Sequence, residues 1–321
     1  MTELIKTYNI TKKFGDMAAV KNISLSVRKG EVLGFLGPNG AGKSTTMKII
    51  TGFIKPDYGS VDICGVCMAD NPLIAKSKIG YLPEGAPAYC DMTPRTLLHF
   101  IAEIRGFYNH TRDKKVAQAA QKTGLYGVLD QNIDTLSKGY KRRVGLAHAI
   151  LHDPDILILD EPTDGLDPNQ KYQVRKLISE MAPHKAIIVS THILEEVEAV
   201  CSRAIIIDKG QIVADGTAES LMGRMPYHKS VALSVAQEDA DKIKVALYNL
   251  VGVIDVEEIS RHNGRVRLRV FPKSQISIVD EIAELVRNQS IAVDELFVER
   301  GKLDDVFRQV TSSDFLTNSS S

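Results

Sequence analysis

The chain has no net charge, no long apolar run and few cysteines. Lys+Arg and Asp+Glu each total 40 in 321 residues, so no overall field attracts the protein to nucleic acid or to an anionic membrane. No apolar run approaches the roughly 18 to 20 residues that span a bilayer, and residues 1–9 lack the apolar core of a signal peptide. We therefore expect a cytoplasmic protein that does any membrane work through partners.

The four cysteines include one C-x-x-C pair, Cys64 and Cys67. A zinc site would need a second such pair or paired histidines, and the sequence offers neither. We interpret the pair as ordinary reduced thiols.

The length suits two domains with separate cores. Residues 1–222 alternate short apolar strands with helical patterns, which predicts an α/β fold with a mixed sheet, and about 93–150 form a helical insert. Residues 225–311 follow the order β-α-β-β-α-β, the ferredoxin-like pattern, and end in an amphipathic helix. The polar residues 312–321 are expected to be a disordered tail. The strands expected in the first domain are 7–10, 23–27, 32–36, 79–82, 156–159, 187–189 and 205–207.

One segment matches G-x-x-x-x-G-K-[ST] between a strand-like run and a helix-like run. Its glycines allow backbone N–H groups to face anionic oxygens, and the start of the helix adds partial positive charge. We expect Lys43 to reach the terminal phosphates and the Ser44 hydroxyl to ligate Mg²⁺. The predicted P-loop and nucleotide-binding segment consists of Gly37, Pro38, Asn39, Gly40, Ala41, Gly42, Lys43, Ser44 and Thr45.

Two adjacent acids follow the apolar run 156–159. A buried strand there would deliver both carboxylates to the edge of the sheet where α/β proteins bind ligands. We expect Asp160 to hold Mg²⁺ directly or through water. Glu161 is expected to accept a proton from the water that attacks the γ-phosphate.

A second turn before a helix-like run, at 136–140, is able to hold phosphate through Ser137, the Gly139 backbone and the helix dipole. Together the motifs resemble those of the nucleotide-binding subunit of an ABC transporter, in register over residues 1 to about 220. The segments that carry this resemblance are 37–45, 136–140, 156–161, 163–167 and His192.

The resemblance implies roles for further residues. Phe14 stands where an aromatic ring stacks on adenine, and His192 stands where a histidine contacts the γ-phosphate and the attacking water. Segment 136–140 would cap the ATP bound by the other subunit, so two copies would close head to tail over two nucleotides. Asp167 would belong to a loop that crosses this interface. We therefore expect a homodimer that hydrolyses ATP.

Two positions depart from the usual pattern of the family. Glu84 stands where the family usually has a Gln that contacts magnesium and links to the membrane subunit. In the signature segment of the family, which corresponds to residues 136–140, Lys138 and Tyr140 replace the usual Gly and Gln. These variants are similar to those of type-2 exporters of the gliding-motility, multidrug and copper-processing kinds, and segment 298–307 resembles the tail of the same ATPases. We interpret the second domain as a packing or dimerisation module, the alternative being a ligand sensor that gates hydrolysis.

The sequence thus predicts an ATPase subunit that uses ATP and Mg²⁺ at the cytoplasmic face of the membrane to power the multi-span permease of an exporter. A groove near 84–95 is expected to receive the permease, and no nucleic-acid partner is expected. One alternative is an importer ATPase of the methionine type, with a C-terminal regulatory domain. Another is a soluble ABC ATPase that acts on nucleic acid or ribosomes, but that class has tandem cassettes, coiled-coil arms or a basic surface.

Overall fold

The computed structural model describes residues 2–85, 89, 91–273 and 277–311, and the expected disordered tail 312–321 lies outside them. The described chain divides into two units. One holds the residues up to Ala218 and from Val310, and the other is Glu219–Gln309. We keep the domain limits 1–222 and 225–311 as a proposal.

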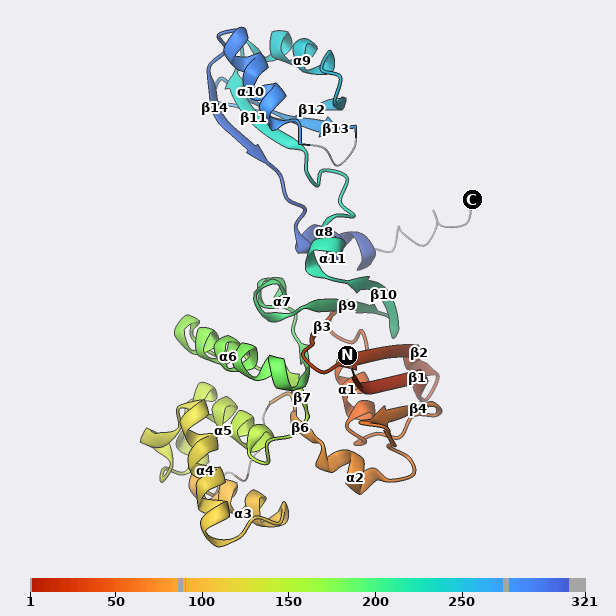
Figure 1. Ribbon diagram of the computed structural model, residues 1–321, viewed down its shortest axis with the longest axis vertical. Helices are drawn as coiled ribbons and strands as arrows, with labels where there is room; N and C mark the ends of the chain where they lie inside the picture. Colours follow the sequence, from red (N-terminus) through yellow and green to blue (C-terminus); the bar gives the residue numbers. More distant parts are fainter. Residues whose placement is uncertain (1, 86–88, 90, 274–276, 312–321) are drawn as a thin grey trace. The chain divides into compact units, whose positions relative to one another are not determined.

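A six-stranded mixed sheet forms the centre of the first unit (Figure 1). Five neighbouring strands are parallel, and the sixth pairs antiparallel at one edge. In spatial order the strands are β10 (Gln211–Gly216), β9 (Arg203–Asp208), β3 (Val32–Leu36), β8 (Ala186–Ser190), β7 (Ile156–Asp160) and β6 (Ile79–Leu82).

One face of this sheet is covered by α1 (Lys43–Ile50) and by a four-stranded antiparallel sheet. Leu33 and Phe35 of β3 point to this side, and Val32 belongs to the core on the other side. Strands buried on both faces are continuous apolar runs, which explains why β3 and β7 have no polar alternation. The second sheet has the order β2 (Met17–Arg28), β1 (Glu3–Phe14), β4 (Tyr58–Ile63) and β5 (Val66–Cys67).

Helices from the predicted insert build the core on the opposite face, together with the helix that follows β7. The insert contains α3 (Pro94–Ile104), α4 (Asn109–Thr123) and α5 (Lys138–Ile150), with two short 3₁₀ turns, η1 (Tyr126–Val128) and η2 (Ile133–Thr135). The remaining elements of this unit are α2 (Pro72–Ser77), α6 (Pro168–Met181), η3 (Ala182–His184) and α7 (Leu194–Val200). None of the helices in the described part of the chain has the length and hydropathy that crossing a bilayer requires.

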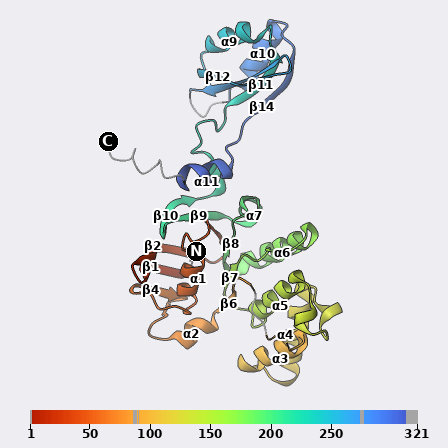
Figure 2. The same cartoon turned by 180° about the vertical axis from the view of Figure 1, so that it is seen from behind.

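The second unit has the predicted ferredoxin-like order of elements, seen from both sides in Figures 1 and 2. Its antiparallel sheet has the strand order β12-β13-β11-β14, and alternate residues of the strands pack on α9 and α10. The elements from 218 onward are α8 (Ala218–Met222), β11 (Val231–Ala236), α9 (Ala240–Tyr248), β12 (Val253–His262), β13 (Arg265–Pro272), α10 (Val279–Asn288), β14 (Val293–Val298) and α11 (Leu303–Thr311).

Candidate nucleotide-binding and hydrolysis site

The predicted phosphate-binding, acidic and histidine residues gather where four neighbouring parallel strands end. The glycine-rich loop follows β3, His192 follows β8, the two acids stand at the end of β7, and Glu84 follows β6. The carboxyl ends of parallel strands share one edge of a sheet, which is where α/β proteins bind ligands.

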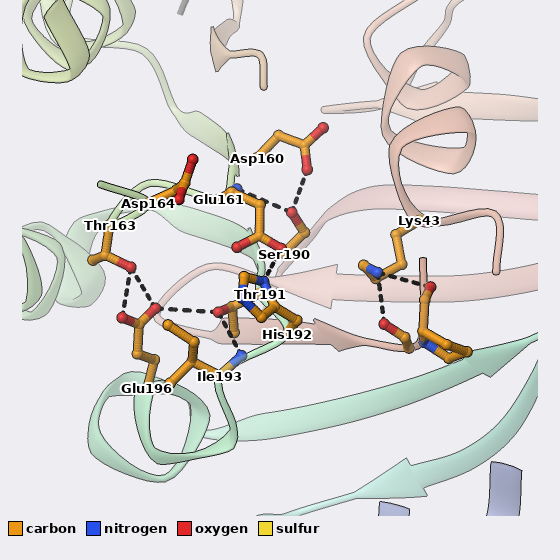
Figure 3. A network of polar contacts seen from close by, with 12 residues as sticks. Lys43, Asp160, Glu161, Thr163, Asp164, Ser190, Thr191, His192, Ile193 and Glu196 are labelled. Atoms are coloured by element: carbon orange, nitrogen blue, oxygen red, sulfur yellow. Dashed lines mark hydrogen bonds and ion pairs between the residues drawn. The ribbon is translucent and has the colours of Figure 1, made fainter. Parts of the chain in front are cut away.

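The loop from 37 to 42 bends closely around the start of α1. The Lys43 ammonium donates to the carbonyls of Gly37 at 2.6 Å and Pro38 at 3.1 Å (Figure 3). Gly42 has φ +108°, and a Cβ at this position would lie 2.4 Å from the carbonyl oxygen of Ala19. Only glycine fits there, because both the backbone conformation and the close approach exclude a side chain.

The loop presents a row of small or polar groups beside this lysine. Pro38, Asn39 and Gly40 are exposed, while Ser44 and Thr45 are half-buried on the first turn of α1. The first turn of a helix has N–H groups without partners in the helix. The arrangement is therefore suited to bind the oxygens of a phosphate.

Asp160 is buried, with 1% of its surface exposed. Its Oδ1 accepts a hydrogen bond from the hydroxyl of Ser190, but its Oδ2 has no hydrogen-bond partner among the described residues. A buried carboxylate oxygen without a partner is costly. It is therefore a natural ligand for a divalent cation or for water bound to one.

Glu161 has φ +50°, a left-handed conformation that residues other than glycine adopt rarely. Its N–H faces Ser190, 3.2 Å from the carbonyl oxygen and 3.1 Å from the hydroxyl oxygen. Its carboxylate lies 3.0 Å from Nδ1 of His192 (Figure 3). The unusual backbone thus places the carboxylate beside the histidine that follows the neighbouring strand.

Burial and the neighbouring groups act on the charges of this cluster in different directions. Burial raises the pKa of Glu161 and Asp160 adds to the rise, whereas the hydrogen bond with His192 and the charge of Lys43 reduce it. Burial lowers the pKa of Lys43, although Glu161, Asp160 and Glu84 all act against it. The exposed Glu84 is thus close enough to influence the lysine electrostatically.

Other predicted site residues lie apart from this network. Within the described part of the chain, no hydrogen bond or ion pair joins Phe14, Ser137 or Gly139 to it. Phe14 is 47% exposed at the end of β1. The Ser137 side chain caps α5 by accepting from the Tyr140 N–H, and Asp167 caps α6 in the same way through the N–H of Gln170 at 2.9 Å.

Arg142 is a member of the site that the sequence did not indicate. From α5, the guanidinium donates to the backbone carbonyls of Asp160 at 2.6 Å, Pro83 at 3.1 Å and Glu161 at 2.9 Å, the last from Nε. A second bond reaches the Glu161 carbonyl from Nη2. Burial lowers the pKa of Arg142. In the sequence Arg142 stands between two other basic residues, Lys141 and Arg143, so no local signal distinguished it.

The signature segment also contacts its own chain. Lys138 lies 2.9 Å from Oδ2 of Asp164, and this pairing lowers the pKa of the Asp164 carboxyl. Both side chains are largely exposed, so the pair contributes little stability. The lysine that replaces the usual glycine thus has a partner in the turn after β7.

Comparisons with known proteins show the family of the chain. Residues 20–164 match the family model described as "ABC transporter". The chain is 31% identical over 309 residues to the linearmycin resistance ATP-binding protein LnrL of Bacillus subtilis, covering 96% of this chain and 98% of that protein. It is 37% identical to the Nod factor export ATP-binding protein I of Burkholderia orbicola, covering 67% of this chain and 71% of that protein.

Solved structures with the same fold include ATP-binding cassettes. The "ATP binding subunit of ABC transporter" has a TM-score of 0.64 and 28% identity, covering 69% of this chain and 92% of that one. A dimeric ATP-binding cassette in a post-hydrolysis state, bound to ADP and Pi, has a TM-score of 0.63 and 25% identity over 67% of this chain and 98% of that one. The chain belongs to the ATP-hydrolysing ATP-binding proteins of the ABC transporter family.

Proposed function

We propose that the protein is the ATPase of an exporter, in which two copies close over Mg·ATP and hydrolysis opens them again. The observation that carries this proposal is the pairing of Glu161 and His192 at 3.0 Å, within electrostatic reach of Lys43. The attack of water on a γ-phosphate needs three groups: a base, a second polar group and a cation that binds the phosphate.

In the proposed reaction, the terminal phosphates take the place of the loop carbonyls as partners of Lys43. Glu161 accepts a proton from the attacking water, and its raised pKa makes it a stronger base than an ordinary carboxylate. His192, which is exposed beside it, orients the water and contacts the γ-phosphate. The adenine ring stacks on Phe14.

The residues present fit a magnesium ion. Asp160 offers a buried carboxylate oxygen that has no hydrogen-bond partner within the described part of the chain, and Ser44 offers a hydroxyl at the start of α1. These two side chains, with Glu84 nearby, would hold Mg²⁺ when nucleotide is bound. The ion would supply positive charge against the charge that develops on the phosphate oxygens.

A head-to-tail dimer gives the signature segment its role. Ser137 and Asp167 are exposed at the starts of α5 and α6. We propose that Ser137 and Gly139 contact the ATP held by the other copy, and that Asp167 crosses the interface. The related cassette that is described as dimeric with ADP and Pi supports this arrangement.

The proposal of export is supported by the relatives, whose names refer to linearmycin resistance and Nod factor export. We propose that a permease docks at the cytoplasmic face of the membrane, on a largely apolar cavity of the first unit. Its lining includes Phe53, Tyr81, Pro83, Arg105 and His148. This cavity adjoins the start of the predicted groove 84–95, of which residues 86–88 and 90 lie outside the described residues.

The experiment that tests this function uses Glu161→Gln, which retains the shape of the side chain but removes the base. The variant should bind ATP, accumulate as a dimer in size-exclusion chromatography with Mg·ATP, and lose most turnover. Undiminished steady-state hydrolysis would remove Glu161 from the role of base.

Purification of the native protein tests the proposed partner. Retention of a multi-span membrane protein supports the exporter, whereas retention of RNA or DNA would favour the soluble class of ABC ATPase.

A further inference from the structure

A buried carboxylate that the proposed reaction does not use lies behind the site. Glu196, in the first turn of α7, is only 4% exposed. The Thr163 hydroxyl faces both of its carboxylate oxygens, at 2.6 Å and 2.5 Å, and the Thr191 hydroxyl donates to Oε2 at 3.2 Å (Figure 3). Both threonines are buried as well. The carboxylate therefore joins two segments far apart in the sequence.

Two cations of α6 face the same carboxylate. Lys171 Nζ lies 3.7 Å and Arg175 Nη2 lies 3.6 Å from Oε1 of Glu196. A buried carboxylate needs such compensation, because leaving it without partners costs several kcal/mol. Glu196 thus connects three elements: the turn after β7, the loop after β8, and α6.

The position of these contacts links them to the reaction. Thr163 lies two residues after Glu161, and Thr191 immediately precedes His192. Thr191 also accepts the N–H of Ile193 at 3.0 Å, so its hydroxyl helps to set the backbone on both sides of the histidine. A shift of one segment against the other would separate the carboxylate of Glu161 from the imidazole.

We propose that Glu196 is a positioning residue for ATP hydrolysis. It holds the turn 161–167 and the loop 190–193 in one arrangement, so that Glu161 and His192 stay paired. Asp167, at the end of that turn, caps the helix that carries Lys171 and Arg175. The Glu196 carboxylate thereby connects the turn 161–167, which includes the Asp167 proposed to cross the interface, to the loop 190–193, which includes His192. This inference rests on the proposed roles of Glu161 and His192.

The test measures ATP hydrolysis by the full-length protein. Glu196→Gln keeps the shape but removes the charge, and Thr163→Val keeps the shape but removes the donor. Each should lower kcat about tenfold, since small misplacements of catalytic groups have effects of this size or larger, while KM for ATP stays within about twofold. The matched control is Glu195→Gln, an exposed neighbour on α7 that should keep the kcat of the native protein.

Two further variants separate positioning from a general loss of structure. Thr163→Ser restores the hydroxyl and should recover most of the activity that Thr163→Val loses. The double variant Glu196→Gln with Thr163→Val should be no slower than the worse single variant, because both changes act on the same contact, that between Thr163 and the Glu196 carboxylate. Equal losses in the serine and valine variants, or additive losses in the double variant, would overturn the proposal.

A melting experiment completes the design. Positioning predicts that the variants keep their ATP-dependent dimer and lose kcat out of proportion to any fall in melting temperature. A loss of kcat that tracks the loss of melting temperature across the series would instead assign Glu196 a purely structural role. If Glu161→Gln retained full turnover, the proposed function would fail, whatever the Glu196 series showed.

Discussion

Nδ1 of His192 lies 3.0 Å from Oε1 of Glu161, although 31 positions separate the two residues in the chain. His192 follows β8 and Glu161 follows β7, and these two strands are hydrogen-bonded neighbours that run parallel. The contact therefore depends on the register of two central strands of the sheet.

Replacement of the histidine should affect turnover more than binding. His192→Ala leaves Glu161 without its polar partner and should lower kcat about 100-fold, the range expected for loss of a group that assists proton transfer. The dissociation constant for ATP, measured by fluorescence titration, should change by less than about fivefold, because Lys43 and the loop remain. The matched control is the exposed His184, whose change to alanine should leave kcat intact. Equal losses in the two variants would contradict the assignment.

The raised pKa of Glu161 predicts a pH dependence of turnover. The carboxylate accepts a proton only when it is ionised, that is, at a pH above its raised pKa. As the pH is lowered, kcat should therefore begin to fall before the pH reaches 4.5, the ordinary pKa of a glutamate. His192 and Lys43 lower the pKa of Glu161 and so shift this fall in kcat to lower pH, whereas Asp160 shifts it to higher pH. A pH profile of kcat that stays flat down to pH 4.5 would contradict it.

The same shift predicts the pH dependence of stability. The folded state disfavours the ionised form of Glu161. The free energy of unfolding of the wild type is therefore reduced only when the pH rises above 4.5, where the group ionises in the unfolded chain. Glu161→Gln should therefore melt at a higher temperature than the wild type at pH 7.5, and the difference should shrink as the pH falls toward 4.5. Melting curves without nucleotide across this range measure it. The opposite trend would show that the partners outweigh burial.

Lys43→Met should have effects of opposite sign with and without nucleotide. Burial lowers the pKa of the lysine, so an apolar side chain of similar length relieves a cost and should raise the melting temperature of the free protein. The gain in melting temperature on adding Mg·ATP should largely vanish, because stabilisation by a ligand follows its affinity. Lys55→Met, at an exposed position, serves as the control. A full ATP-induced shift in the Lys43 variant would contradict the role of this residue.

Gly42→Ala should damage the loop without a change of charge. The new Cβ would meet the Ala19 carbonyl, at a φ that alanine avoids, so we expect a loss of about 1–3 kcal/mol in the free energy of unfolding and weaker ATP binding. Gly127→Ala is the control, since a Cβ there has open space and no positive φ. Urea denaturation and nucleotide titration measure the two effects. Matching results for the two alanine variants would remove the close approach as an explanation.

Arg142→Lys tests the bonds between α5 and the ends of the strands. Lysine has no planar fork and cannot reach the carbonyls of Pro83, Asp160 and Glu161 together, so we expect a loss of about 2 kcal/mol in the free energy of unfolding and a lower kcat. Arg143→Lys changes the neighbouring arginine, which bonds to Gln173 at the surface, and should have little effect. Denaturation curves and steady-state kinetics distinguish the two variants. No difference between them would contradict the structural role of Arg142.

Much of the fold follows from local patterns in the sequence. The buried strands β3 and β7 are apolar runs, with Asp160 as the last residue of β7, so the strands predicted at 32–36 and 156–159 are confirmed. In β11 and β13 large apolar residues alternate with small or polar ones, and both strands occur in the predicted order of elements. The strands β4, β5 and β10, of which β5 and β10 lie at sheet edges, were not predicted. In β4 the first three residues are exposed and only Val61 and Ile63 are buried, so the apolar pattern that marks a strand is short.

Part of the candidate site could also be predicted from the sequence, and part could not. The residues of the glycine-rich loop follow one another in the chain, and so do the two acids, so each motif can be recognised from its own residue types and their order. Ser190, Arg142 and Glu196 act through contacts that the packing of β7, β8 and α5 creates. A buried serine at the end of a strand, or a glutamate in a short helix, has no local pattern that distinguishes it from an ordinary residue.

The left-handed backbone of Glu161 has a consequence for how this position evolves. A glycine there would adopt φ +50° without strain and would leave no carboxylate away from water, so the fold alone favours losing the glutamate. A gene copy that no longer needs to turn over its nucleotide would gain stability by such a change. The glutamate at this position therefore lowers the stability of the fold, and the chemistry proposed for its carboxylate accounts for its presence.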